Sequence, residues 1–265
     1  MSKLRQLFLI IALLPVCVMA QEEEPAPFTS DLFGGPTSTD ALPKGRLQWE
    51  TYAFYERNAL FGYETKSWCF NSSMLRYGVI NGLELCMKAA WLHTRVEGED
   101  GEEGENLHGI GDLAVGAKAC LFKGWKAIPS IALRGYLYFP GGKNSDFLPQ
   151  KFNYELDLIF NNRINSWFDV AYMGGVYWDD TPRPTILWDI CLNFTLSDKF
   201  TLSLEQDNDY VGSAEEEKVQ SWAEIGFFYQ VHPRVELGIV SDVNLRHFKD
   251  YFNVMLGMSW QLTKK

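Results

Sequence analysis

The chain has 265 residues, of which 46% are hydrophobic and 15% aromatic, and its formal net charge is −10. An acidic chain of this kind has no electrostatic attraction for nucleic acid, so we expect no nucleic-acid partner. No stretch after the first 20 residues approaches the roughly 18 uninterrupted apolar residues of a transmembrane helix. The chain is therefore either a soluble exported protein or one that crosses a membrane as strands.

Residues 1–20 have the pattern of a secretory signal peptide. Lys3 and Arg5 precede an apolar run that ends at about Val18, and the residues before the predicted cleavage site after Ala20 are small enough for processing. Lipoprotein processing at Cys17 is the alternative. Removal of this segment takes away two bases and no acids, so the remaining 245 residues have 22 basic and 34 acidic side chains, a net charge of −12.

Residues 21–43 are rich in Pro, Gly, Ser, Thr and acidic residues, without periodicity, and are predicted to form a flexible periplasmic N-terminal extension. From there the pattern changes, and residues 44–265 are predicted to form a single β-barrel. Its segments exceed the five or six residues typical of soluble sheets and match the roughly 9 to 11 needed to cross a bilayer at a tilt. The twelve predicted strands are approximately 45–56, 65–79, 83–96, 110–122, 127–139, 152–162, 166–178, 185–196, 199–210, 218–231, 234–244 and 250–262.

The connections between these strands alternate between two kinds. Those at 80–82, 123–126, 163–165, 197–198 and 232–233 are short, whereas the others are mostly longer and more polar. Short turns at one end and longer loops at the other are typical of an up-and-down antiparallel barrel in the bacterial outer membrane. The even number of strands predicts that both termini lie in the periplasm.

Side-chain parity separates an apolar face from a polar face in the predicted strands around 84–92, 112–121 and 251–262. A soluble sandwich would show the same alternation, so the period alone does not decide between the two classes. The placement of tryptophan favours the membrane barrel, because all nine Trp lie within a few residues of a predicted strand end or in a turn. Two interfacial belts of aromatic residues require this placement.

The charged strand residues share the parity opposite to the apolar face, which predicts that they line the lumen. Twelve acids against four bases that lie away from the strand ends would favour cations or neutral solutes over anions. Alternatively, these charges pair across strands and brace a narrow, largely filled lumen. The predicted lumen-lining residues are Arg76, Glu84, Lys88, Asp112, Lys118, Arg134, Glu155, Asp157, Asp169, Asp189, Glu205, Asp207, Glu224, Glu236 and Asp242, together with Glu50.

Two of these residues, Arg76 and Glu84, flank the turn at 80–82 and are predicted to form a structural ion pair near the periplasmic mouth. Cys86 and Cys120 have the inward parity and lie symmetrically about the loop 97–109, so a disulfide between them is a hypothesis. The acidic loop 97–109 lacks the spacing of a calcium loop, and we interpret it as solvated.

The sequence suggests no catalytic, cofactor or metal site. The mature cysteines have no CxxC spacing and none lies near a His, which disfavours zinc. None of the four His is followed two residues later by the Ser that outer-membrane phospholipases use. A protease-like site would need Asp179, Asp180 and His247 to meet at the extracellular rim. We therefore expect that the protein is not an enzyme.

Four stretches occur in an order and spacing that resemble the Putative MetA-pathway of phenol degradation family: KGRLQWET at 44–51, LRYGVINGLEL at 75–85, GIGDLAVGAKACLF at 109–122 and IPSIALRGYLYFPGG at 128–142. The resemblance implies an outer-membrane transporter or channel for small, aromatic or hydrophobic solutes. Its partners would be outer-membrane lipid and the permeant, without a cofactor. A structural or plugged barrel is the alternative, followed by a barrel hydrolase, and the sequence leaves the oligomeric state open.

Overall fold

The computed structural model describes residues 28–31, 38–59, 64–97, 105–125, 127–142, 145–214 and 218–263. The predicted signal peptide lies outside the described residues, as does most of the acidic stretch of the loop 97–109. Within the described ranges, no helix has both the length and the apolarity required to cross a membrane.

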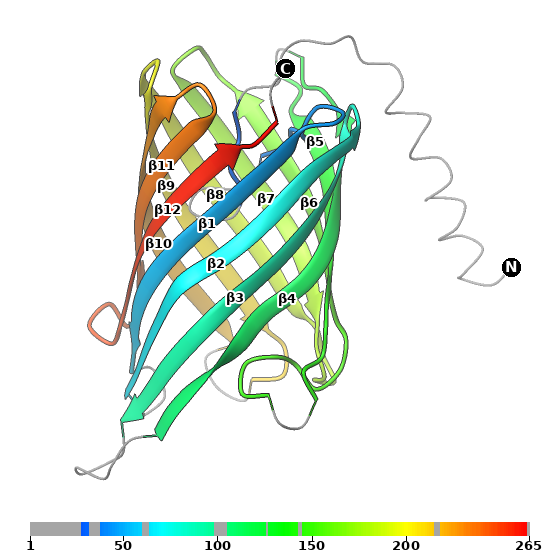
Figure 1. Cartoon of the computed structure of the whole chain (residues 1–265). Helices are drawn as coiled ribbons and strands as arrows, with labels where there is room; N and C mark the ends of the chain where they lie inside the picture. The colour runs from blue at the N-terminus through cyan, green and yellow to red at the C-terminus, as the bar shows by residue number, and fades with distance from the viewer. Residues whose placement is uncertain are drawn as a thin grey trace, which may run out of the picture.

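Twelve antiparallel strands form one closed barrel in which each strand pairs with its neighbours in sequence and β1 pairs with β12 (Figure 1). The fold class predicted from the sequence is therefore confirmed. The strands are β1 Leu47–Asn58, β2 Glu64–Ile80, β3 Leu83–Glu97, β4 Glu105–Phe122, β5 Ser130–Tyr138, β6 Asn153–Arg163, β7 Phe168–Trp178, β8 Thr185–Ser197, β9 Phe200–Val211, β10 Val219–His232, β11 Val235–Asn244 and β12 Tyr251–Gln261.

The largest departures from the predicted strand bounds lie in β4 and β5. β4 begins at Glu105 because its polar first residues continue to pair with β3, and the two strands extend past their neighbours (Figure 1). Backbone pairing does not require apolar and polar residues to alternate, so the hydrophobic pattern of the sequence did not predict this extension of β4. β5 begins only at Ser130, because Pro129 has no N–H to donate to a ladder.

The outer face of the barrel is apolar and the inner face is polar. In β3, Leu85, Met87 and Trp91 are exposed, whereas Glu84 and Cys86 are buried. The same alternation holds along the other strands, so the outward residues form the surface that would contact lipid. Parity in the sequence was therefore enough to orient the strands.

The tryptophans follow the predicted belts with one exception. Eight of the nine lie in turns or have the outward parity. Trp222 instead shares the inward parity of the buried Phe228, and its ring packs edge-on against Tyr251 at 6.4 Å between centroids. Its position near a strand end does not distinguish a lipid-facing ring from one at the mouth of the lumen, so the prediction was wrong for this residue.

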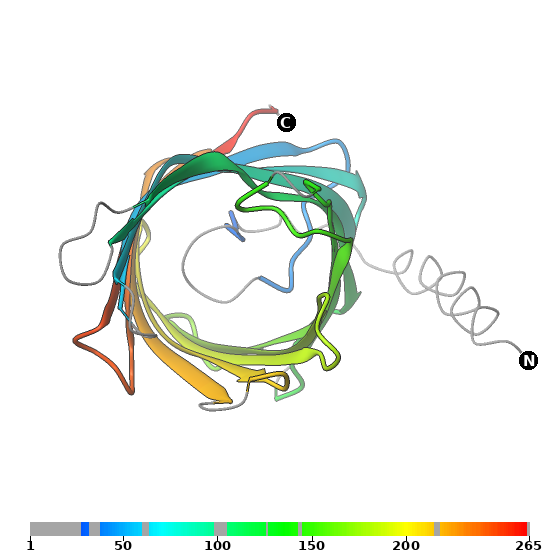
Figure 2. The same ribbon diagram turned by 90° about the horizontal axis from the view of Figure 1, so that it is seen from below.

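We call the end of the barrel with the short connections the turn end and the opposite end the loop end. The turn between β2 and β3 consists of Asn81 and Gly82, and Gly82 has a φ of 83°, which glycine adopts without strain. The described residues 28–31 and 38–43, which we call the lumen segment, enter the barrel from the turn end and lie inside it (Figure 2).

Candidate functional site

The lumen segment leads into β1 through Gly45 and Arg46, which extend the β1–β2 ladder to Gly78. Gly78 accepts a hydrogen bond from the Gly45 N–H at 2.7 Å and donates one to the Arg46 carbonyl at 2.9 Å. A Cβ atom on Gly78 would lie 2.1 Å from the Pro43 carbonyl oxygen. Only glycine therefore allows the segment to approach β2 so closely at this point.

A buried cluster of charges joins the segment to the wall, and Arg76 is at its centre. The Arg76 guanidinium contacts Glu50 at 2.7 Å, Glu84 at 2.9 Å and Asp31 of the lumen segment at 2.8 Å. Lys118 also contacts Asp31, and it lies 3.4 Å from Glu84. All five side chains are almost completely buried. The ion pair predicted between Arg76 and Glu84 is thus present as part of a larger network.

Backbone groups of the lumen segment complete this network. The Arg76 guanidinium donates to the Thr29 carbonyl at 3.0 Å, and the Leu42 N–H donates to Glu84 at 2.7 Å. The Asp31 N–H donates to Glu50 at 2.8 Å. Buried polar groups in the segment and the wall therefore satisfy one another.

The charge of Asp31 is fixed by its two cationic neighbours. Burial opposes ionisation of this carboxyl group, but Arg76 and Lys118 overcome that effect and lower the pKa of Asp31 below its ordinary value of 3.8. With three acidic side chains against two basic ones, the formal net charge of the cluster is −1.

These contacts correct one prediction. The composition of residues 21–43 indicated a flexible extension in the periplasm, but the described part of this segment is anchored inside the barrel. Thr39 and Leu42 are buried, with 4% and 3% of their surfaces exposed. Polar, turn-rich sequence avoids an apolar core, yet it is compatible with a polar lumen, which composition alone does not reveal.

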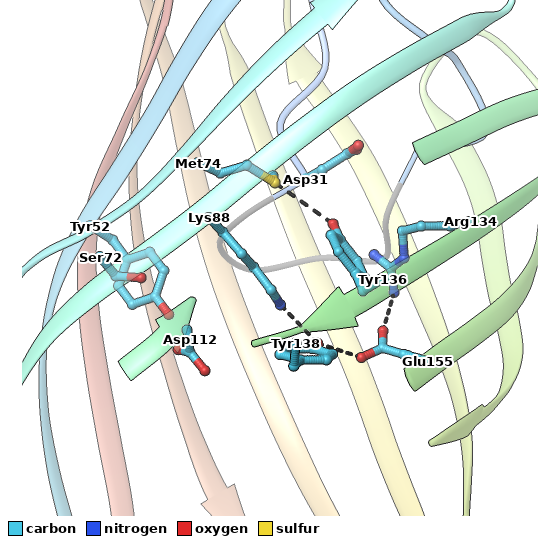
Figure 3. A pocket seen from close by; sticks show the side chains of 10 residues that line it. All are labelled: Asp31, Tyr52, Ser72, Met74, Lys88, Asp112, Arg134, Tyr136, Tyr138 and Glu155. Carbon is cyan, nitrogen blue, oxygen red and sulfur yellow. Dashed lines mark hydrogen bonds and ion pairs between the residues drawn. The ribbon is translucent and has the colours of Figure 1, made fainter. Parts of the chain in front are cut away.

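A second group of inward side chains lines a cavity of about 140 Å³ on the loop-end side of Asp31 (Figure 3). Tyr136 and Tyr138 form one side, and the Lys88 ammonium lies 4.4 and 4.7 Å from the centres of their rings. Lys88 also donates to the Tyr138 hydroxyl at 3.0 Å, and that hydroxyl donates to Glu155 at 2.5 Å. Tyr52 lines the cavity as well.

Arg134 lines the same cavity on the turn-end side of the two tyrosines (Figure 3). Its guanidinium contacts Asp157 at 2.8 Å and Glu155 at 3.4 Å, and it lies 5.3 Å from the ring centre of Tyr136. Tyr136 also packs over Gly116, where a Cβ atom would come within 2.5 Å of the ring. The cavity therefore combines aromatic faces with fixed positive and negative charges.

The opposite wall of the lumen is acidic. Strands β7 to β12 contain no Lys or Arg, whereas all strand Lys and Arg residues lie on β1 to β6. Carboxylate oxygens of Asp189, Glu205 and Asp207 lie within 4.8 Å of one another. A second cavity, of about 200 Å³, lies between this wall and the lumen segment and is lined by Asp169 and Glu236.

All the predicted lumen residues have the inward parity, and they divide into three groups. Arg76, Glu84, Lys118 and Glu50 hold the lumen segment. Lys88, Asp112, Arg134, Glu155 and Asp157 belong to the tyrosine-lined cavity or support it, with Asp112 at a positive φ of 51°. The acidic wall comprises Asp169, Asp189, Glu205, Asp207, Glu224, Glu236 and Asp242.

Sequence reasoning missed Asp31 and the inward tyrosines. Asp31 lies in a segment without periodicity, so no pattern distinguishes it from a solvated acid. Tyr136 and Tyr138 share the inward parity of Arg134 on β5, and this shared parity could have identified them as lumen residues. A tyrosine fits either face of a barrel, because its ring is apolar and its hydroxyl is polar.

The cysteine and histidine placements bear on the remaining predictions. Cys86 pairs with Gly116, not with Cys120, and the two buried cysteines are not joined by a disulfide, so the disulfide hypothesis is wrong. The symmetry about 97–109 fails because β4 begins at Glu105, so the register brings Gly116 beside Cys86. His93 and His108 stack on the outer face at 6.2 Å between ring centres. His247 lies 3.8 Å from Asp250 in its own loop.

Comparison with known proteins gives a family and a set of structures with the same fold. Residues 30–247 match the model of the family described as "Putative MetA-pathway of phenol degradation". No curated protein matches the sequence. The COG4313 outer membrane channel from Pseudomonas putida F1 has a TM-score of 0.68 at 14% identity, with 87% of this chain and 100% of that chain covered.

Two further solved structures are similar at lower scores. The NanC porin has a TM-score of 0.54 at 10% identity, with 81% of this chain and 100% of that chain covered. The transport unit of the autotransporter AIDA-I from Escherichia coli has a TM-score of 0.53 at 8% identity, with 96% and 97% covered. At these identities the likeness establishes the barrel fold.

Proposed function

Because the chain belongs to the Putative MetA-pathway of phenol degradation family, we propose that it is an outer-membrane channel for small solutes, including aromatic ones. The observation that carries this proposal is the contrast between an apolar outer face and a polar lumen that holds cavities beside the lumen segment. A soluble barrel would have the reverse polarity. The turn end would face the periplasm and the loop end the exterior, after export through the predicted signal peptide.

The side chains along the lumen support a preference among solutes. Tyr52, Tyr136 and Tyr138 offer ring faces to an aromatic permeant, and a cavity of about 140 Å³ beside them accommodates a group of single-ring size. Arg76, Lys88, Lys118 and Arg134 are engaged by carboxylates or tyrosines, whereas the wall of β7 to β12 has acids and no bases. The uncompensated charge is therefore negative, and cationic or neutral solutes are favoured over anions.

The experiment uses two aromatic ions of similar size, benzylammonium and benzoate, because neutral aromatics cross a lipid bilayer without a channel. The refolded protein is reconstituted in planar bilayers, and the reversal potential under a concentration gradient gives the permeability ratio. We expect benzylammonium to be favoured. A preference for benzoate would contradict the charge argument, and no conductance for either ion would contradict the channel.

A matched pair of variants tests the origin of the preference. The double change Asp189→Asn and Asp207→Asn removes two charges from the acidic wall and is expected to reduce the preference for benzylammonium. The control changes Asp179→Asn and Asp180→Asn remove two charges from the loop between β7 and β8. Equal permeability ratios for the two double variants would contradict the assignment of selectivity to the wall.

A plugged barrel with a structural role is the second candidate, and the anchoring of the lumen segment favours it. Five buried charges and several backbone hydrogen bonds hold the segment in place. A barrel of this kind would retain every solute while the segment is docked and would conduct only when the segment is released by mutation. Comparison of the conductance of the unmodified protein with that of the variants described in the Discussion separates the two functions.

A further inference from the structure

Charged side chains on the outer face of the barrel are concentrated in one place. Among the described side chains of the twelve strands, those with the outward parity are uncharged except at the loop end of β1, β2 and β3. There, three bases and one acid lie together: Arg57, Lys66, Arg95 and Glu64. We call these four residues the basic patch.

The bases of this patch form a row across three strands. Arg57 is the register partner of Lys66, and Lys66 is the register partner of Arg95. The Glu64 carboxylate lies between two of them, 2.9 Å from the Arg57 Nε and 3.2 Å from the Lys66 Nζ. This acid fixes the positions of two cationic groups while the patch retains a net charge of +2.

The row is also tied to the neighbouring loop. A guanidinium nitrogen of Arg57 donates to the Lys249 carbonyl at 3.0 Å, and the Ala59 N–H donates to the Asp250 carbonyl at 2.7 Å. Arg95 has an exposed side chain and no ion-pair partner among the described residues. The patch thus has a defined geometry and one base that is available to a ligand.

A row of aromatic rings lies next to the bases on the side of the membrane centre, two residues closer to the middle of each strand. Tyr55 pairs with Trp68, Trp68 with His93, and His93 with His108. Trp68 and His93 are stacked at 4.2 Å between ring centres. Rings of this kind mark the boundary between hydrocarbon and headgroups.

An outward Lys or Arg is costly within the hydrocarbon and tolerated near the headgroups, so the patch lies at headgroup level. The chain as a whole is strongly acidic, and a local excess of bases facing the bilayer therefore requires its own explanation. Phosphate groups suit this arrangement, since Arg and Lys bind them through short charge-assisted hydrogen bonds. The neighbouring stacked rings, on the side of the membrane centre, offer a surface for sugar rings or the first carbons of acyl chains.

We propose that the basic patch binds the phosphates of a phosphorylated glycolipid in the outer leaflet of the outer membrane. The proposal rests on the orientation given under the proposed function, in which the loop end faces the exterior. It does not rest on transport, because the patch residues face away from the lumen.

The first test needs no variant. Native mass spectrometry of the detergent-purified protein is used to compare a diphosphorylated disaccharide lipid with the same lipid after removal of its phosphates. We expect at least tenfold tighter binding of the phosphorylated form. Equal binding of both forms would overturn the proposal. Inorganic phosphate is added in a separate arm, and displacement of the lipid at millimolar phosphate would mean that the site recognises free phosphate.

The second test locates the site. The triple variant Arg57→Gln, Lys66→Gln and Arg95→Gln is expected to lose the tenfold preference for the phosphorylated lipid. An unchanged preference would overturn the assignment to this patch. Folding is checked by the mobility of unheated samples on gels, and single-channel conductance should match that of the unmodified protein.

The control removes the same charge at the opposite end of the barrel. Lys123, Lys199 and Arg234 lie in the connections at the turn end, and the variant with all three changed to Gln should retain the lipid preference. If both triple variants lose the preference equally, binding follows net charge and the patch is not a site. Failure of the channel proposal would appear in the conductance alone, so the two proposals are tested separately.

Discussion

The docking of the lumen segment can be tested at a single side chain, Asp31. Replacement by Asn keeps the size of the side chain and an oxygen that accepts the Ser38 N–H, but it removes the charge that contacts Arg76 at 2.8 Å and Lys118. A hydrogen bond to a charged group contributes about 1.5–3 kcal/mol. Two such contacts are lost, one to Arg76 and one to Lys118. Because the change also removes the net charge of −1 in the cluster, we expect the docked segment to lose only the lower end of the summed range for two contacts, about 3 kcal/mol.

This energy converts to an expected change in population. Since each 1.4 kcal/mol is tenfold, about 3 kcal/mol makes the undocked segment about a hundredfold more populated. Hydrogen exchange measures this at the Leu42 amide, which donates to Glu84 at 2.7 Å only when the segment is docked. Exchange there should be about a hundredfold faster in Asp31→Asn, and single-channel recordings should show more frequent large openings.

The control is Asp40→Asn, the same chemical change in the same segment at a carboxyl group with no ion pair among the described residues. Its exchange rate at Leu42 should match that of the unmodified protein. If Asp31→Asn and Asp40→Asn exchange at the same rate, the charged cluster does not hold the segment. An altered rate at Leu42 without a change in openings would mean that the segment does not obstruct the path of ions.

Protonation of Asp31 should have the same effect as its replacement. Its pKa is lower in the docked state than its ordinary value of 3.8, so the stabilisation is complete above that value and is lost as the pH falls through the docked-state pKa. Protection of the Leu42 amide should therefore persist from neutral pH down to about 4. Loss of protection already at pH 6 would contradict this assignment.

Three further predictions concern the barrel wall. Gly78→Ala places a Cβ atom 2.1 Å from the Pro43 carbonyl oxygen and should release the segment, whereas Gly174→Ala, with nothing within 4 Å, should leave exchange unchanged. Arg134→Met leaves the buried Asp157 without its cation and should destabilise the barrel by about 3–5 kcal/mol, measured as a lower temperature for loss of the folded band on gels. Thiol titration of the unfolded, unreduced mature chain should find four free thiols, and fewer would indicate a disulfide.

The barrel could be predicted from the sequence because, in each strand of a membrane barrel, alternate side chains face lipid and the polar lumen, so apolar and polar residues alternate. Leu85 and Met87 face outward and Glu84 inward with no information beyond parity. The Asn81–Gly82 turn fixed the hairpin of β2 and β3, which in turn placed Arg76 beside Glu84. Each of these inferences depends on contacts between neighbouring strands, and such contacts are local in a meander.

The parts that escaped prediction depend on contacts that are distant in sequence. Asp31 meets Lys118, 87 residues away, and no local pattern records that pairing. The relation between Cys86 and Cys120 depended on the register across a long loop, and β4 begins at Glu105, earlier than its polar sequence indicated. Trp222 faces inward near a strand end, where position along the strand carries no information about the face.

The docked segment has a consequence for selectivity as well as for pore size. Arg76 and Lys118 are inward bases in the turn-end half of the barrel, and the segment covers both with an additional acid. Without Asp31, the cluster of Glu50, Glu84 and the two bases is neutral; with it, the net charge is −1. Docking therefore buries positive charge on one wall and leaves the acidic wall of β7 to β12 as the exposed one. We expect Asp31→Asn to raise conductance and weaken the preference for benzylammonium together, because release of the segment exposes the two bases to the permeant. An increase in conductance with a stronger cation preference would contradict this coupling.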